Sequence, residues 1–475
     1  MKVRAQFMAA SLMVITAWSA AGVTSVQARR PNILLIVIDD VGYADLGVQG
    51  SRDIQTPNVD RLAREGIRFT DAYVTGPYCS PTRAALLTGR YQQRFGHEFN
   101  IELANRDGGL PLGETTLAVR LKTAGYRTAL FGKWHLGTAP QFHPMRRGFE
   151  EFFGFLGGGH SYVDVGTGAN ALLDGTAPAT SVGYLTDTLA DRAAAYIKRH
   201  AGEPFFLYLA FNAAHTPMHA TEKYLARFGH IADERRRTYA AMMAAMDDGV
   251  GRTLAALREA NLDRDTLVFF FSDNGGPTME TTTINGSSNA PLRGSKRTTW
   301  EGGIRVPFVI RWTDRLPAGR VERRPIIQLD VLPTALAAAG VAVDRSTALD
   351  GVDLLPFLRG TAKGQPHDAL YWRFGGMMAI RQGDWKLVRS RIGPFVDDDP
   401  AVLADLSGAE LFNLAEDISE TTNLAAAHPD KVKALGEAWQ RWNRRLAKPL
   451  WGPPRGGRGG NAPVSAASRV SVGPR

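Results

Sequence analysis

Two adjacent pairs of oxygen-bearing side chains are the first candidates for chemistry, Asp39-Asp40 and Asp273-Asn274. Three carboxylates and one amide suit a hard cation such as Ca²⁺, which takes oxygen ligands. Either pair alone is as readily a cap for a helix or a turn. Because each pair follows an apolar run, we predict that both lie at strand ends of one sheet and hold one Ca²⁺.

Basic and imidazole side chains are expected beside this cation, namely Arg83, Lys133, His135, His215 and Lys296. A divalent cation with three basic groups forms a pocket for a compact oxyanion such as sulfate or phosphate. A single histidine is more often structural than catalytic. Two histidines at one rim favour proton transfer, since an imidazole titrates near neutral pH.

Continuous apolar runs predict the buried strands that must position these residues, as parallel sheets covered on both faces require. The runs cover residues 32–38, 126–132, 204–211 and 266–271. Helical patterns cover residues 56–66, 117–124, 186–200 and 236–260. This alternation predicts an α/β fold with a large, mostly parallel sheet sandwiched by helices. Ligands of such sheets lie beyond the carboxyl ends of the strands, which gathers the candidate residues at one rim.

The pattern changes after about residue 365. Short runs predict four antiparallel strands and a last amphipathic helix, at residues 369–374, 378–381, 384–388, 410–414 and 430–446. The tail is rich in Gly, Pro, Ser and Arg, a composition typical of disorder. We therefore predict a leader (1–28), a catalytic domain (29–365), a small α+β subdomain (366–451) and a disordered tail (452–475).

The first residues are typical of an export leader. Lys2 and Arg4 precede a mostly apolar stretch, and a small-x-small pattern ends at Ala28. We predict cleavage after Ala28 and a periplasmic or secreted protein. The apolar stretch is too short for a comfortable membrane span, so no stable membrane insertion is expected, with an uncleaved anchor as the alternative.

The formal net charge of +9 is concentrated at the two ends of the chain. Two basic residues lie in the leader and four arginines in the tail, and neither segment contains an acid. The segment between them is nearly balanced, which argues against a nucleic-acid binder with a basic face.

Cys79 is the only cysteine of this apparently exported chain. Exported proteins usually pair their cysteines in disulfides, so a single one indicates a reactive thiol. The alternative is a buried small hydrophobic residue, since free cysteine is often buried. The neighbouring residues decide between the two interpretations.

The run from Cys79 to Arg90, CSPTRAALLTGR, resembles the signature of type I, formylglycine-dependent sulfatases of the alkaline-phosphatase-like superfamily. The resemblance extends over nearly the whole mature chain and is somewhat closer to the N-acetylgalactosamine-6-sulfatase and arylsulfatase branch. Further matching blocks are residues 132–137, 273–276, 296–303, 411–414 and 420–424.

The resemblance implies that a separate formylglycine-generating enzyme oxidises Cys79 to Cα-formylglycine, an aldehyde. Its hydrate would attack sulfur, form a covalent sulfate ester and expel sulfate as the aldehyde re-forms. Asp39, Asp40, Asp273 and Asn274 would bind calcium together with modified residue 79.

The same resemblance implies roles for the basic and imidazole side chains. Arg83 would help ionise one hydroxyl of the hydrate, and Lys133 and Lys296 would hold sulfate oxygens. His135 would take the proton in the elimination step. His215, with Lys296, would protonate the leaving alcohol.

A sulfated carbohydrate is the preferred substrate, with aryl sulfates as further substrates in vitro. His143 and His160 lie in segments expected to line the pocket mouth, although both could pack against loops. One alternative is a metal-dependent phosphatase or phosphodiesterase of the same superfamily, which favours a Ser or Thr nucleophile and a second metal. Another is a sugar-binding protein without catalysis, which would need an unmodified Cys79.

Overall fold

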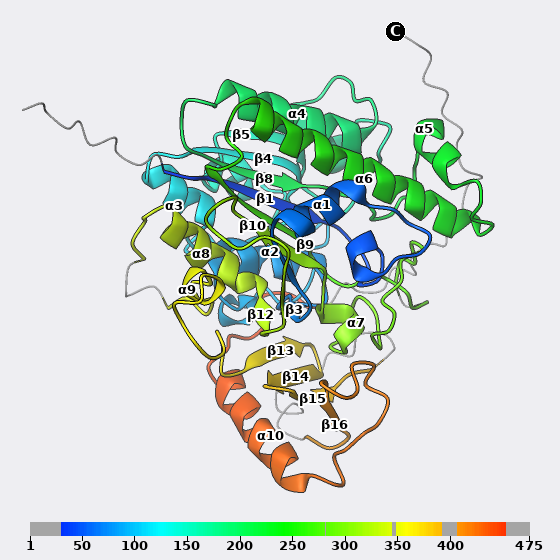
Figure 1. The fold of residues 1–475 in the computed structure, drawn as a ribbon, viewed down its shortest axis with the longest axis vertical. Coiled ribbons are helices and arrows are strands. Elements are labelled where there is room, and N and C mark those ends of the chain that lie inside the picture. The colour runs from blue at the N-terminus through cyan, green and yellow to red at the C-terminus, as the bar shows by residue number, and fades with distance from the viewer. Residues whose placement is uncertain (1–29, 281, 344–347, 392–405, 453–475) are drawn as a thin grey trace, which may run out of the picture.

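The computed structural model describes residues 30–280, 282–343, 348–391 and 406–452, and a large sheet crosses the centre of the fold (Figure 1). Its ten strands lie in the order β11-β2-β10-β9-β1-β8-β4-β5-β6-β7. Their bounds are β1 Asn32–Ile38, β2 Ile67–Phe69, β4 Arg127–Lys133, β5 Glu151–Phe155, β6 Leu173–Asp174, β7 Ala177–Pro178, β8 Phe205–Ala210, β9 Thr266–Ser272, β10 Phe308–Arg311 and β11 Arg320–Glu322.

The centre of this sheet is parallel, and antiparallel strands flank it. β1 pairs in parallel with β8 and β9, with Ile36 beside Leu209 and Phe270, and β4 pairs in parallel with β8 and β5. β10 and β6 run antiparallel to their neighbours β9 and β5. The predicted α/β fold with a mostly parallel sheet is confirmed, and the four apolar runs form its central strands β1, β4, β8 and β9.

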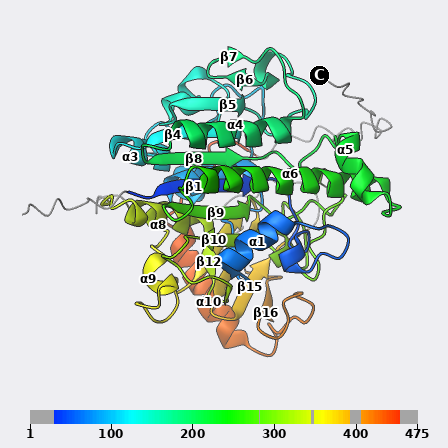
Figure 2. The same cartoon turned by 45° about the horizontal axis from the view of Figure 1, so that its top comes forward.

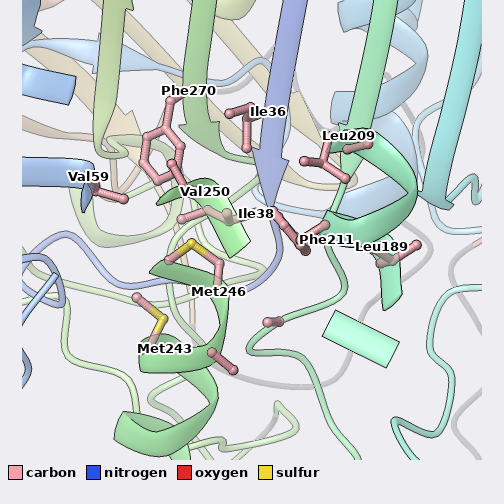
Figure 3. Close-up of a cluster of buried hydrophobic side chains, with 14 of the residues drawn as sticks. Ile36, Ile38, Val59, Leu189, Leu209, Phe211, Met243, Met246, Val250 and Phe270 are labelled. Atoms are coloured by element: carbon pink, nitrogen blue, oxygen red, sulfur yellow. The ribbon is translucent and has the colours of Figure 1, made fainter. Parts of the chain in front are cut away.

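Alternating side chains of β1 build a separate hydrophobic core on each face of the sheet. Leu34 and Ile36 belong to one core, which α1, α4, α5 and α6 cover (Figures 2 and 3). Ile33 and Leu35 belong to the other, which α2, α3, α8 and α9 cover. Burial of each such side chain stabilises the fold by about 1.5–3 kcal/mol. The helix bounds are α1 Pro57–Glu65, α2 Cys79–Thr88, α3 Leu117–Thr123, α4 Leu185–Arg199, α5 Glu222–Leu225, α6 Glu234–Glu259, α8 Val331–Ala338 and α9 Leu355–Leu358.

A smaller antiparallel sheet, in the order β13-β14-β15-β16, follows with a helix packed on it. Trp439 of this helix donates from its indole to the Trp372 carbonyl (2.9 Å), and Trp372 donates to the Val74 carbonyl (2.7 Å) of the larger part. The predicted strands and last helix are confirmed, while the boundary near residue 365 stays a prediction. The bounds are β13 Leu370–Phe374, β14 Met377–Gln382, β15 Trp385–Arg389, β16 Glu410–Asn413 and α10 Pro429–Asn443.

Short elements connect these parts. They include the parallel pair β3 Ala72–Tyr73 and β12 Ile326–Ile327, the helix α7 Glu301–Ile304, and 3₁₀ turns at Gly47–Gln49, Gln92–Phe95, Pro140–Phe142, Pro144–Arg146, Gly168–Asn170, Ala226–Phe228 and Gln328–Asp330. The predicted leader, and all of the predicted tail but residue 452, lie outside the described residues. Among the described residues, no helix is long and apolar enough to span a membrane.

Candidate active site

The central strands deliver the predicted acidic residues to one rim of the sheet. β1 leads into Asp39 and Asp40, and its neighbour β9 leads into Asp273 and Asn274. Because β1 and β9 are parallel, both pairs leave the sheet at the same edge. Helix α2 begins beside them at Cys79, whose Sγ lies 3.7 Å from Asp39 Oδ1.

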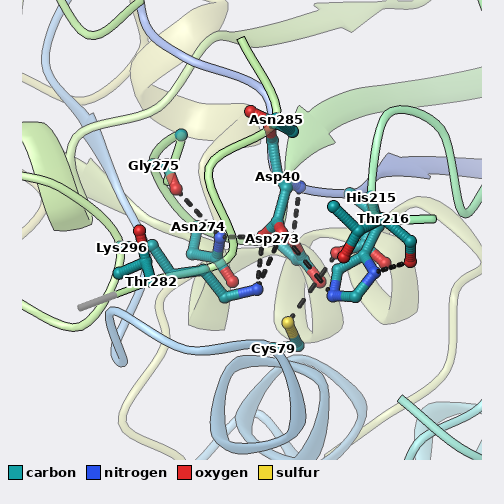
Figure 4. Close-up of polar contacts among 12 residues, drawn as sticks. Asp40, Cys79, His215, Thr216, Asp273, Asn274, Gly275, Thr282, Asn285 and Lys296 are labelled. Carbon is teal, nitrogen blue, oxygen red and sulfur yellow. Dashed lines mark hydrogen bonds and ion pairs between the residues drawn. The ribbon is translucent and has the colours of Figure 1, made fainter. Parts of the chain in front are cut away.

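Asp39, Asp40, Cys79 and Asp273, named here the rim cluster, offer ligand atoms that lie within 4.8 Å of one another. All four side chains are fully buried. The Asn274 amide donates to Asp40 Oδ1 at 2.7 Å, and its buried Oδ1 has no partner among the described residues (Figure 4). Three carboxylates that converge at one buried point, with a buried amide oxygen on the neighbouring residue Asn274, fit a hard divalent cation.

Each carboxylate of the rim cluster also has a basic partner. Lys133 Nζ lies 2.5 Å from Asp39, and Lys296 Nζ lies 2.6 and 2.8 Å from the two oxygens of Asp40. Arg83 donates to Asp273 from Nε at 3.0 Å and from Nη2 at 2.8 Å. The three basic groups are buried as well, so the rim combines three acids and three basic groups in one buried region.

The two neighbouring aspartates differ in acidity. Burial and the charge of Asp273 raise the pKa of Asp39 to about 7, although Lys133 and Arg83 oppose the rise. Burial also acts against ionisation of Asp40, but Lys296 and His215 outweigh it and lower the pKa of Asp40 to about 2. Burial and the crowding of three acids therefore make Asp39 hard to ionise even beside its basic partners, and an added cation would relieve that strain.

Burial keeps the two predicted catalytic histidines neutral. It lowers the pKa of His215 to about 3, against the attraction of Asp40, and with Lys133 it lowers the pKa of His135 well below its usual value. His215 Nδ1 lies 2.6 Å from the Thr216 carbonyl, which makes Nδ1 the donor and leaves Nε2, 3.6 Å from Asp40, free to accept.

Backbone strain is concentrated at the same rim. Asp40 and His135 adopt left-handed φ angles of 59° and 58°, which are uncommon for residues other than glycine and cluster at functional sites. The turn after Asn274 needs Gly275, because a Cβ there would lie 1.8 Å from the Gly302 carbonyl oxygen. Gly302 is needed for its own reason, because a Cβ there would lie 2.6 Å from the Gly294 carbonyl oxygen.

The unmodified thiol of Cys79 is a poor nucleophile in this setting. Burial raises its pKa to about 12, although Lys133 and Lys296 oppose the rise. The thiol is therefore protonated at neutral pH, whereas a reactive cysteine needs a lowered pKa.

Sequence reasoning missed a network behind the nucleophile position. Ser80 Oγ donates to the His135 carbonyl at 2.6 Å and lies 2.6 Å from His97 Nε2. The Ser80 N–H also donates to Asn100 Oδ1 at 3.0 Å. This network ties the start of α2 to the strained residue His135. Ser80 fills a variable position of the signature run, and no local signal singled out His97 or Asn100.

The two histidines predicted at the pocket mouth are placed differently. His143 caps a 3₁₀ turn by accepting from the Met145 N–H at 3.3 Å, and its ring packs on Phe152. The structure records no contact between His143 and the rim cluster. His160 follows Gly159, whose Cβ position would lie 3.2 Å from the His215 ring, but its own ring is buried, packs on Phe155 with 5.1 Å between the ring centres, and has Nδ1 2.6 Å from the Ser161 carbonyl.

Fold and site together define an enzyme built to hold an anionic ester beside buried acids and cations. The sulfatase family model matches residues 31–341, and the model of the N-sulphoglucosamine sulphohydrolase C-terminal region matches residues 294–435. The chain belongs to the sulfatase family, and it is a sulfuric ester hydrolase.

Named relatives and solved structures agree. The chain is 38% identical to N-acetylgalactosamine-6-sulfatase of Canis lupus familiaris, over 78% of this chain and 73% of that protein. It is 34% identical to arylsulfatase A of Homo sapiens, over 94% of both. The crystal structure of Ps i-CgsB matches with a TM-score of 0.81 and 36% identity, covering 89% of this chain and 95% of that one. A phosphonate monoester hydrolase of Agrobacterium radiobacter, at 23% identity and a TM-score of 0.61, shares the fold alone.

Proposed function

We propose that this sulfatase hydrolyses sulfated carbohydrates and depends on calcium and on conversion of Cys79 to Cα-formylglycine. The observation that carries the proposal is the position of Cys79, a protonated, buried thiol 3.7 Å from Asp39 within the rim cluster. A thiol in that state has little use as a nucleophile. Oxidation to an aldehyde, by a separate maturation enzyme, gives this position a chemical function.

Asp39, Asp40, Asp273 and Asn274 would bind the calcium ion together with residue 79. The spare Oδ1 of Asn274 and the raised pKa of Asp39 support this assignment. When present, the hydrated aldehyde supplies a nucleophilic oxygen and a second hydroxyl for sulfate release, and calcium supplies charge that favours ionisation of the first.

The basic side chains would bind the sulfate group. Lys133 and Lys296 are buried cations at the rim, placed to neutralise sulfate oxygens as charge develops on breaking of the S–O bond. Arg83 would fix Asp273 through its two hydrogen bonds. With substrate bound, these cations would take the place of water around the sulfate ester, and their charges would already be oriented toward it.

Two neutral histidines and a charged lysine would move the protons. His135 would take the proton when sulfate is expelled, which its lowered pKa in the free site permits. Lys296, whose pKa Asp40 holds well above its usual value against the effect of burial, carries a proton in the free site. The leaving alcohol would receive its proton from the pair of Lys296 and His215.

A sulfated sugar is the substrate class that the relatives favour. They include N-acetylgalactosamine-6-sulfatases, and Ps i-CgsB has been solved in complex with k-i-k-neocarrahexaose. His160, whose neighbour Gly159 lies beside the His215 ring, would contact the sugar, whereas His143 would support the mouth through its packing on Phe152. The leader predicts that the enzyme works outside the cytoplasm.

The decisive experiment compares matured wild type with Cys79→Ala and Cys79→Ser. Enzyme produced with a maturation enzyme should release sulfate from members of a panel of sulfated saccharides. Both variants should lose turnover by roughly 10³-fold or more, and Cys79→Ser should accumulate a sulfate ester visible by mass spectrometry, because it has no second hydroxyl to expel it. Ordinary turnover by matured Cys79→Ala would overturn the mechanism. Faster turnover of a phosphate monoester than of every sulfate ester would overturn the substrate class.

A further inference from the structure

A cavity of about 440 Å³ lies on the small C-terminal part of the molecule, and none of its lining residues belongs to the site described above. Its lining residues are Tyr371 of β13 together with Ala438, Arg441, Trp442 and Arg445 of α10 and the turn that follows. Two features of this cavity point to a ligand, an aromatic wall and an unbalanced positive charge.

The aromatic wall is held firmly in place. The rings of Tyr371 and Trp442 stack at 5.2 Å with an interplanar angle of 12°. Tyr91 supports both, because its ring meets Trp442 edge-on at 5.2 Å and its hydroxyl accepts from the Tyr371 N–H at 3.2 Å. Trp442 is buried, whereas Tyr371 is half-buried, so Tyr371 presents the accessible part of the wall.

The positive charge comes from Arg441 and Arg445, which are exposed and one helical turn apart. Neither forms an ion pair with a carboxylate among the described residues, whereas Arg373 and Arg381 nearby pair with Glu98 and Asp71 at 2.6 and 2.7 Å. Burial raises the pKa of the Tyr371 phenol, Arg445 and Arg441 oppose that rise, and Asp368 adds to it, so two guanidinium groups and one carboxylate lie near the phenol and leave an excess of positive charge.

Ordinary helix energetics do not explain this arrangement. A basic residue in the last turn interacts favourably with the helix dipole, which accounts for Arg441. Arg445 lies beyond the end of α10 at Asn443, so the helix dipole does not account for it. A bound anion would favour two like charges placed side by side.

We propose that this cavity is a second, non-catalytic binding site for a sulfated sugar residue. A sulfate group matches the hydrogen-bonding geometry of two guanidinium groups, and the apolar face of a sugar ring packs on an aromatic side chain. The choice of sulfate rests on the proposed function. Binding of a second residue of a polymeric substrate would raise the effective concentration of its sulfate esters near the molecule.

The test measures binding of dextran sulfate by isothermal titration calorimetry with the full chain carrying Cys79→Ala, which prevents turnover. Adding Arg441→Gln and Arg445→Gln should weaken binding about tenfold, a loss of about 1.4 kcal/mol. The matched control carries Lys433→Gln and Arg444→Gln, which remove the same charge from exposed positions that do not line the cavity. The control substitutions should weaken binding less than about threefold, because the charges they remove act on the ligand only through long-range, screened electrostatics.

Further measurements separate the cavity from general charge effects. Tyr371→Ala, which keeps both arginines, should also weaken binding of dextran sulfate, and neutral dextran should not bind. Equal losses in the cavity and control variants would overturn the proposal, as would tighter binding of a DNA oligonucleotide than of dextran sulfate. In a background with Cys79 intact, turnover of nitrophenyl sulfate should be unchanged by Arg441→Gln and Arg445→Gln. Failure of all sulfate release would instead count against the proposed function.

Discussion

The rim cluster and a second buried cluster of charges use similar side chains for different ends. The second, named here the seam triad, consists of Glu301, Lys386 and Glu420 where the small sheet meets the larger part. Lys386 Nζ lies 2.8 Å from each glutamate, and the Glu301 N–H donates to Glu420 at 2.7 Å. All three side chains are buried, as are those of the rim cluster.

The difference lies in what remains for a partner outside the chain. In the seam triad each carboxylate has a cation or an N–H of the protein, and Glu301 has further partners in Tyr73 and Arg305. In the rim cluster three acids crowd within 4.8 Å, and the Asn274 oxygen beside them has no partner among the described residues. The carboxylates of both clusters have basic partners, and Glu420 Oε1 of the seam triad likewise accepts no hydrogen bond from the described residues, although Lys386 lies beside it. Buried charge alone therefore does not mark a site, whereas three acids crowded within 4.8 Å of one another do.

The largest expected contrast concerns metal. Removing divalent ions from the matured wild type with a chelator should abolish sulfate release and lower the melting temperature, and Ca²⁺ should restore both, because the proposed ion would bind only the folded rim cluster. Asp273→Asn should lose at least about 10²-fold in turnover and most of the thermal response to Ca²⁺. Glu420→Gln, in the seam triad, should keep that response. If Ca²⁺ did not change the melting temperature of the wild type, the proposed difference between the rim cluster and the seam triad would be wrong.

The seam triad should instead control stability. Lys386→Met leaves two glutamates buried without their shared cation, so we expect the free energy of unfolding to fall by about 3–5 kcal/mol. Guanidinium denaturation measures this, and the exposed Lys431→Met, whose ammonium lies 4.5 Å from the Trp385 ring centre, is the control with a loss within about 1 kcal/mol. Turnover per folded molecule should stay unchanged. A loss no larger than that of the control would show that the triad is dispensable.

The seam triad also predicts a pH dependence of stability. Burial, with the charge of Glu301, raises the pKa of Glu420 to about 7 from its ordinary 4.5, against the effect of Lys386. The folded state thus binds more protons than the unfolded state between these values, and this contribution to stability is lost as pH rises from about 4.5 to about 7. Glu420→Gln lacks it, so its stability relative to wild type should rise by on the order of 2 kcal/mol over that window. If the free energies of unfolding of wild type and Glu420→Gln changed with pH in parallel, the raised pKa of Glu420 would be contradicted.

The smallest expected effect tests the network behind the rim cluster. His97→Ala removes the partner of Ser80 Oγ, which itself holds the His135 carbonyl, so we expect kcat to fall about tenfold with KM little changed. His97→Gln keeps a donor and should restore part of the rate. Steady-state kinetics with nitrophenyl sulfate measures both variants. Full activity in His97→Ala would reduce this network to a packing contact.

Much of the fold could be predicted from the sequence because its signals are local. The apolar run before Asp39 is a strand of a parallel sheet, and the proline before Asn58 begins a helix as expected, although the Thr56 side chain forms no capping hydrogen bond. The antiparallel strands β6 and β10 were not predicted. They are short, and their pairing depends on neighbours far away in the chain.

The residues of the candidate site also fall into two groups, those that the sequence predicts and those that it does not. Asp39, Asp273 and Lys133 could be proposed from sequence, because each follows a recognisable strand. His97 and the seam triad could not, since their partners lie between 17 and 119 positions away and no residue pattern encodes those distances. His143, expected either at the pocket mouth or packed against loops, caps a 3₁₀ turn in the structure.

By itself, the sequence determined the four central strands, the helices α1, α3, α4, α6 and α10, and the chemical groups at the strand ends, because periodicity and residue type act over a few positions. It also indicated the family through the run that begins at Cys79. Only the tertiary structure decided which charges neutralise one another and which oxygen is left over at Asn274. The physical reason is that desolvation and Coulomb energy depend on distances between residues that the folded chain alone brings together.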